Sequence, residues 1–142
     1  MDQINPNYYK NENTQSSLID ILHDHPMDYL AFDLGNAIKY IYRAGRKESF
    51  KQDIEKALTY LNFFLAKVAT DTEFNQTKRV VNTQSIFDFV NSAEITPHQK
   101  EWLIDLLQFS YGSSKNEFQE NLKLIKDTVY SIKCYLNQQD LI

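Results

Sequence analysis

Residues 28–45 decide the fold class, and they read DYLAFDLGNAIKYIYRAG. At about 100° per residue, the apolar positions of this stretch fall within one arc of a helix. Those positions are Leu30, Leu34, Ala37, Ile38 and Ile41. Asp28 is a good N-cap, and Gly45 lies where a left-handed residue commonly ends a helix. The stretch therefore predicts an amphipathic helix over residues 28–44, with one face on a core.

The rest of the chain carries similar start and stop signals. Gly and Pro together supply six residues, against about 17 expected at average usage. Because sheets of this size need many tight turns, so few turn residues favour a small number of long helices. Further helices are predicted over 15–24 and 49–69. Three more helices begin at Thr83, Thr96 and Ser114. The sequence Thr-Pro-His-Gln at Thr96 is a capping box with Pro at the first helical position. The predicted fold class is all-α, about six helices in a compact bundle with no convincing strand.

Gly112 is expected to end the fifth helix, and the apolar residues of the sixth step by three and four. That apolar set is Leu122, Ile125, Val129, Ile132 and Leu136. The chain divides into a motif-bearing region (1–70), a polar connector (71–82) and a three-helix region (83–142). We expect the last region to pack on the first as one domain.

Composition excludes several classes of protein. The formal net charge is −4, which disfavours duplex nucleic acid as a partner. The single cysteine, Cys134, permits neither an internal disulfide nor a thiolate metal cluster. No apolar run approaches the roughly 18 residues of a membrane span, and the first residues lack the features of a signal peptide. We expect a cytoplasmic protein that has no membrane partner and no resident metal.

Charge is segregated along the chain. Residues 36–56 contain six basic and three acidic side chains, so this segment carries +3 and the remainder −7. On the helix over 28–44, one side opposite the apolar arc carries basic and amide residues, and the next turn extends it. These residues are Asn36, Lys39, Arg43, Arg46, Lys47 and Lys51. The pattern predicts an anion site, to which the N-terminus of the next helix adds N–H groups. The alternative is a solvated helix face.

Three sequence blocks are similar to a known family. They are NPNYY at residues 5–9, LGNAIKYIYRAGRK at 34–47 and DIEKALTYL at 53–61. They resemble small tailed-phage proteins that carry Asn-Pro-x-His-Tyr, then Leu-Gly-Asn-x-x-Lys-Tyr-x-x-Arg-x-Gly-x-Lys, then Asp-Leu-x-Lys-Ala-x-x-Tyr-Leu. Members of that family are described as uncharacterised or as nucleotide kinase-like, after one that phosphorylates deoxynucleoside monophosphates without a P-loop. Tyr8 stands where the family has His. Its phenol donates a hydrogen bond but does not gain or lose a proton near pH 7, which weakens the expectation of catalysis more than that of binding.

The resemblance implies a nucleotide site and its residues. Nucleotide or phosphate binding falls to Asn5, Tyr9, Asn36, Lys39, Tyr40, Arg43, Arg46, Lys47 and Lys56. The catalytic candidates are Lys39, Arg43 and Asp53. No cofactor is required, although Mg²⁺ would accompany a bound nucleotide. For Tyr9, Tyr40 and Tyr60 the alternatives are core packing or stacking on the base. For Asp53 the alternatives to catalysis are a favourable interaction with the helix dipole or a salt bridge to Arg43.

Three functional hypotheses follow. The first is a phage-type nucleotide-binding protein similar to P-loop-less nucleoside monophosphate kinases, acting in the host cytoplasm. The second is a non-catalytic protein that sequesters a nucleotide against host defence. The third is an inhibitor that binds a host protein through its acidic surface. A helical pyrophosphatase is disfavoured, because Glu117 and Glu120 have no second acidic pair downstream. The many aromatic residues after 83 predict a homo-oligomer seam or, alternatively, packing within the chain.

Overall fold

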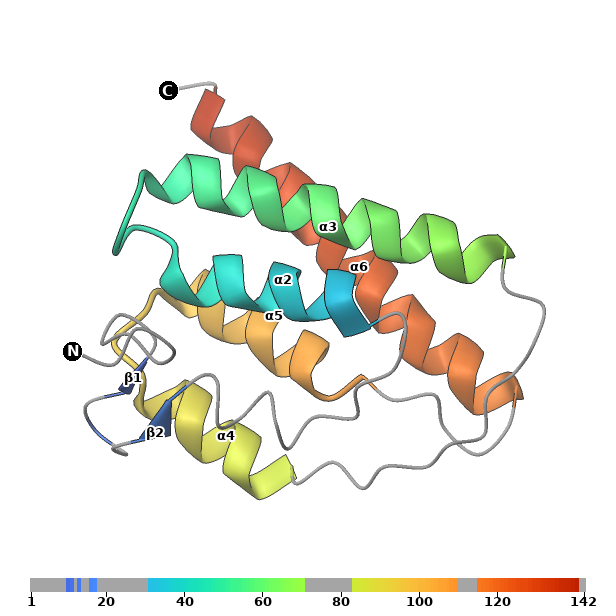
Figure 1. The fold of residues 1–142 in the computed structure, drawn as a ribbon, viewed down its shortest axis with the longest axis horizontal. Coiled ribbons are helices and arrows are strands. Elements are labelled where there is room, and N and C mark those ends of the chain that lie inside the picture. Colours follow the sequence, from blue (N-terminus) through green and yellow to red (C-terminus); the bar gives the residue numbers. More distant parts are fainter. Residues whose placement is uncertain are drawn as a thin grey trace.

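The computed structural model describes residues 10–11, 13, 16–17, 31–70, 83–109 and 115–140. Within these ranges the fold is all-α apart from one pair of two-residue strands, which confirms the predicted fold class. None of the described helices is long and apolar enough to cross a membrane. The elements, labelled as in Figure 1, are β1 (Lys10–Asn11), β2 (Ser16–Ser17), α2 (Ala31–Arg43), α3 (Phe50–Thr70), α4 (Thr83–Ser92), α5 (Pro97–Leu107) and α6 (Lys115–Asp140).

The helices pack around one another in a layered bundle (Figure 1). The α2 and α3 helices form an antiparallel pair, α5 packs on α2, and α6 packs on both α3 and α5. The α4 helix contacts α5. Each of α2 to α6 contributes side chains to the buried core, in which Trp102, Phe64 and Phe89 are almost fully enclosed. The helices after residue 83 therefore share a core with the motif-bearing pair.

Gly45 and Thr96, which the sequence predicted to end and begin helices, do so in the structure, and the predicted apolar face of the last helix is buried. Gly45 follows α2 with φ +84°, the left-handed conformation that favours glycine. Thr96 caps α5 through a complete capping box with Gln99. All five apolar residues predicted to face the core from the last helix are buried in α6. These three predictions are confirmed.

Two predicted boundaries are wrong. Residues 16–17 form β2 instead of part of a helix over 15–24. Strands of two residues are too short to show the alternation of apolar and polar residues from which a strand is predicted. The α5 helix ends at Leu107, with Gln108 as its C-cap, short of the predicted stop at Gly112. Asp28, Gly112, Ser114 and the connector over 71–82 lie outside the described residues.

Asn11 ties the N-terminal strand pair to the C-terminal end of α4. β1 pairs antiparallel with β2, Asn11 lying opposite Ser16. The buried Asn11 amide donates from Nδ2 to the Phe89 carbonyl at 2.6 Å and to Ser92 Oγ at 3.0 Å, and its Oδ1 accepts from the Asn13 N–H at 2.9 Å. Asn13 Nδ2 donates in turn to the Ser92 carbonyl. One side chain thus satisfies a carbonyl at the end of a helix 78 positions away.

Asn11→Ala is expected to lower the free energy of unfolding by about 1–3 kcal/mol, because it removes three hydrogen bonds made by one buried side chain. Urea denaturation monitored by circular dichroism measures the change. The matched control is Asn91→Ala, an exposed asparagine of α4, for which the change should stay within about 0.5 kcal/mol. Equal effects of the two substitutions would contradict an anchoring role for Asn11.

Candidate functional site

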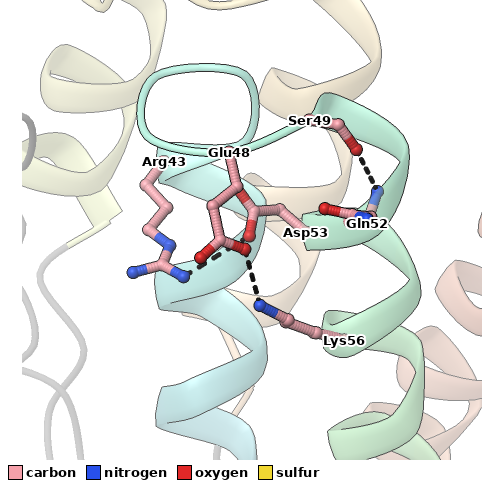
Figure 2. Close-up of polar contacts among 6 residues, drawn as sticks. All are labelled: Arg43, Glu48, Ser49, Gln52, Asp53 and Lys56. Atoms are coloured by element: carbon pink, nitrogen blue, oxygen red, sulfur yellow. Dashed lines mark hydrogen bonds and ion pairs between the residues drawn. The ribbon is translucent and has the colours of Figure 1, made fainter.

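Arg43 does not lie on the solvent face that the sequence pattern predicted. It is buried at 6% exposure, and its guanidinium Nη2 lies 3.4 Å from Oδ1 of Asp53, which is fully buried on α3 (Figure 2). The prediction of an exposed Arg43 is wrong because α3 covers this side of α2. Of the roles left open for Asp53, the geometry supports the salt bridge. Asp53 Oδ2 has no hydrogen-bond partner, so Arg43 supplies the countercharge for a carboxylate enclosed by protein.

Three cationic side chains of α2 and α3 lie close to the ring of Tyr40. The guanidinium of Arg43 lies 4.5 Å from the ring centroid, and the ammonium groups of Lys39 and Lys56 lie 5.3 and 5.5 Å from it. Such distances are in the range of cation–π attraction. The same ring stacks on Tyr60 of α3 with 5.8 Å between centroids and 12° between planes. Tyr40 and Tyr60 are both partly buried against the core, so Tyr40 combines packing with cation contact and Tyr60 packs on it.

Glu48, which the sequence analysis did not single out, pairs with Lys56. The Lys56 ammonium donates to Glu48 Oε2 at 2.7 Å, across the turn that joins α2 and α3 (Figure 2). This hydrogen bond is the main cause of a lowered pKa at Glu48 and of a raised pKa at Lys56. Both side chains are substantially exposed, and solvent screening keeps the contribution of such a pair small.

Lys39 has a different electrostatic environment from its neighbours. It is partly buried on α2, and within the described residues no carboxylate pairs with its ammonium group. Burial, followed by the charges of Arg43 and Lys47, lowers the pKa of Lys39. Arg43 and Lys56 each have a carboxylate partner, whereas Lys39 adjoins other cations. An anion placed beside Lys39 would therefore relieve repulsion for which the described part of the chain supplies no carboxylate partner.

The remaining predicted site residues divide into two groups. Asn36, Arg46 and Lys47 are described: Asn36 donates from Nδ2 to the Phe32 carbonyl of its own helix at 2.9 Å, and Arg46 lies 4.9 Å from the ring centroid of Tyr42. Lys47 is exposed in the turn after α2. Asn5, Tyr8 and Tyr9 lie outside the described residues.

The N-terminus of α3 contributes less to an anion site than the sequence suggested. Ser49 Oγ accepts the backbone N–H of Gln52 at 3.0 Å, which occupies one of the donors of the first turn (Figure 2). In the described part of the chain, no group of three or more His, Cys, Asp and Glu side chains is arranged to hold a metal ion. The cationic side chains are therefore the main candidates for binding an anion on this surface.

Comparison with known proteins bears on the segment that carries these residues. Residues 4–62 match the DUF3310 family, described as a protein of unknown function. The matched DUF3310 segment covers α2, the following turn and most of α3, and it ends before the connector. No curated protein and no solved structure matches the chain. Since the DUF3310 description assigns no activity, the chemistry must be argued from the residues themselves.

Two exposed aromatic residues of the DUF3310 segment escaped the sequence analysis. Phe32 and Phe63 remain 68% and 52% exposed, and both contact the ring of Tyr60. Their spacing contained a signal, because Phe32 lies eight residues before Tyr40 and Phe63 three after Tyr60. Positions so spaced share a helix face. The surface therefore has cations toward the turn and aromatic rings toward the other end.

Proposed function

We propose that the face formed by α2 and α3 binds the phosphate of a nucleotide at Lys39. The observation that carries this proposal is the unbalanced charge at Lys39, which is partly buried and has Arg43 and Lys47 as electrostatic neighbours. A phosphate oxygen beside this ammonium makes charge-assisted hydrogen bonds, which are stronger than neutral ones. Arg43 lies one turn further along the same helix, where its guanidinium pairs with Asp53.

The resemblance to nucleotide kinase-like proteins supports a nucleotide over other phosphorylated ligands. Phosphoryl transfer needs mainly positioning and neutralisation of charge, which a fixed cluster of cations supplies. Transfer of a phosphoryl group between two bound nucleotides is therefore the first candidate activity. Lys39 and Arg43 would neutralise charge, and Asp53 would position Arg43.

Sequestration of a nucleotide without chemistry is the second candidate, and one observation favours it. The two carboxylates nearest the cations are both paired, Asp53 with Arg43 and Glu48 with Lys56. A neighbouring cation makes a carboxylate a weaker proton acceptor, which disfavours both as the base for an attacking hydroxyl group. Binding without turnover would leave these pairs intact.

A thermal-shift panel of mono-, di-, tri- and cyclic nucleotides, with and without Mg²⁺, tests the proposal. A specific ligand stabilises the folded state by mass action, by about 2.7 kcal/mol at a hundredfold excess over its dissociation constant. Stabilisation by both mono- and triphosphates supports transfer and calls for a turnover assay. Stabilisation by cyclic nucleotides alone supports sequestration. No shift with any nucleotide rejects both activities and leaves inhibition of a protein partner as the hypothesis to test.

A further inference from the structure

Three aromatic side chains form a group at the end of the α2–α3 face that lies away from the turn. This aromatic group consists of Phe32 on α2 and of Tyr60 and Phe63 on α3. The Tyr60 ring centroid lies 6.3 Å from that of Phe32 and 6.2 Å from that of Phe63, with interplanar angles of 76° and 87°. Both phenylalanines are more than half exposed. Large apolar side chains this exposed need a reason when they gather at one place.

The aromatic group is continuous with the cations around Lys39. Tyr60 stacks on Tyr40, and the ring of Tyr40 carries Lys39 at 5.3 Å. Tyr40 is itself covered, because Tyr60 stacks on it and Arg43 lies 4.5 Å from its centroid. An incoming planar ligand therefore meets the exposed phenylalanines before it meets Tyr40. Along α2, Phe32 and Lys39 are separated by about 10 Å of helix rise, which is comparable to the length of an extended nucleotide.

We infer that the aromatic group binds the base of a nucleotide whose phosphate lies at Lys39. This inference rests on the proposed function and adds to it the place of the base and the direction of the ligand along the helix pair. A nucleotide joins a planar, uncharged ring to an anionic group, and this surface presents aromatic rings next to uncompensated positive charge. Stacking of bases on aromatic side chains accepts every base, because each has a π face.

The size of the aromatic group favours a base over a second copy of the chain. A stable protein interface buries about 800 Å² on each partner. Aromatic side chains contribute only about 150–250 Å² each, even when fully buried. Phe32 and Phe63 are already partly covered, so they supply much less than a dimer requires. A single heterocyclic ring, by contrast, is of the same size as this group.

The test compares ligands with and without a base. Isothermal titration calorimetry measures the dissociation constants of adenosine 5′-monophosphate, thymidine 5′-monophosphate and ribose 5-phosphate for the full chain. The nucleotides are expected to bind roughly tenfold or more tightly than ribose 5-phosphate, as one stacked base typically contributes. In Phe32→Ala/Phe63→Ala this preference should fall to about onefold to twofold, while the affinity for ribose 5-phosphate stays unchanged.

The control replaces two other exposed large side chains, Leu124 and Tyr130 of α6. Leu124→Ala/Tyr130→Ala should retain the full preference for nucleotides, and circular dichroism verifies that both double variants are folded. A preference unchanged by the loss of Phe32 and Phe63 overturns the inference and leaves the phosphate site standing. If the preference were unchanged and Phe32→Ala/Phe63→Ala also had a lower mass than the parent in sedimentation, the inference would be overturned and the two phenylalanines would be assigned to self-association. Absence of binding by all three ligands overturns the inference and the proposed function together.

Discussion

Replacing Arg43 with Met is expected to lower the free energy of unfolding by about 3–5 kcal/mol, the range for removing one partner of a buried ion pair. Asp53 is fully buried, its Oδ1 faces the guanidinium at 3.4 Å, and its Oδ2 has no hydrogen-bond partner. Without Arg43, the carboxylate of Asp53 would remain in the protein interior without its ion-pair partner. Urea denaturation at neutral pH measures the loss.

A double-mutant cycle separates this mechanism from a loss of packing. Arg43→Met/Asp53→Leu should recover most of the lost stability, because apolar residues of similar volume often replace a buried ion pair without cost. The control is Lys56→Met, which breaks the exposed pair with Glu48 of the turn between the same two helices. It should cost far less stability than Arg43→Met, because solvent screens an exposed pair. If the double variant were as unstable as Arg43→Met, the charge of Asp53 would not be the cause.

The misplacement of Arg43 shows where a helical pattern stops being informative. A projection of one helix identifies the face that is richest in apolar residues, but α2 packs against both α5 and α3. The apolar arc of α2 accounts for one buried face only. The second buried side carries Arg43, whose charge hides its burial from any scale of hydrophobicity. Only the position of Asp53 on the antiparallel α3 explains why a guanidinium can be enclosed there.

Features set by neighbouring residues were predictable, whereas contacts between distant residues were not. The left-handed Gly45 and the capping box of Thr96 depend on a few adjacent positions, so the sequence predicts them. Gln99 illustrates the difference, because it completes that box and also donates from Nε2 to the Ile41 carbonyl at 2.7 Å, 58 positions away. Nothing in the local pattern specifies the second bond. The cations of the candidate site were likewise predictable, but their carboxylate partners and the exposed phenylalanines beside them were not.

For ligand binding, the largest effect is expected from Lys39→Gln. Loss of a charge-assisted hydrogen bond to phosphate should weaken binding of a nucleoside monophosphate by roughly 10- to 100-fold. The fold should be unaffected or slightly stabilised, because the substitution removes a partly buried cation that is repelled by Arg43 and Lys47. Calorimetry gives the affinity, using the monophosphate with the largest thermal shift. Lys133→Gln on α6 makes the same change in net charge at an exposed position and should bind like the parent.

The pH dependence of binding identifies the ammonium group of Lys39 more specifically than the substitution alone. The phosphate of a nucleotide titrates near 6 and stays a dianion above about pH 7. With adenosine 5′-monophosphate, whose base does not titrate above that pH, any later change in affinity belongs to the protein. Because burial and two cations lower the pKa of Lys39, affinity should fall as pH rises through that lowered pKa.

Stability of the free protein should change in the opposite direction. The folded state holds the Lys39 proton less tightly than the unfolded state, so unfolding takes up protons and stability rises with pH between the lowered and the ordinary pKa. The slopes of affinity and of stability against pH should both change in Lys39→Gln and should both match the parent in Lys133→Gln. If Lys39→Gln had the same slopes as the parent, Lys39 would not belong to the site.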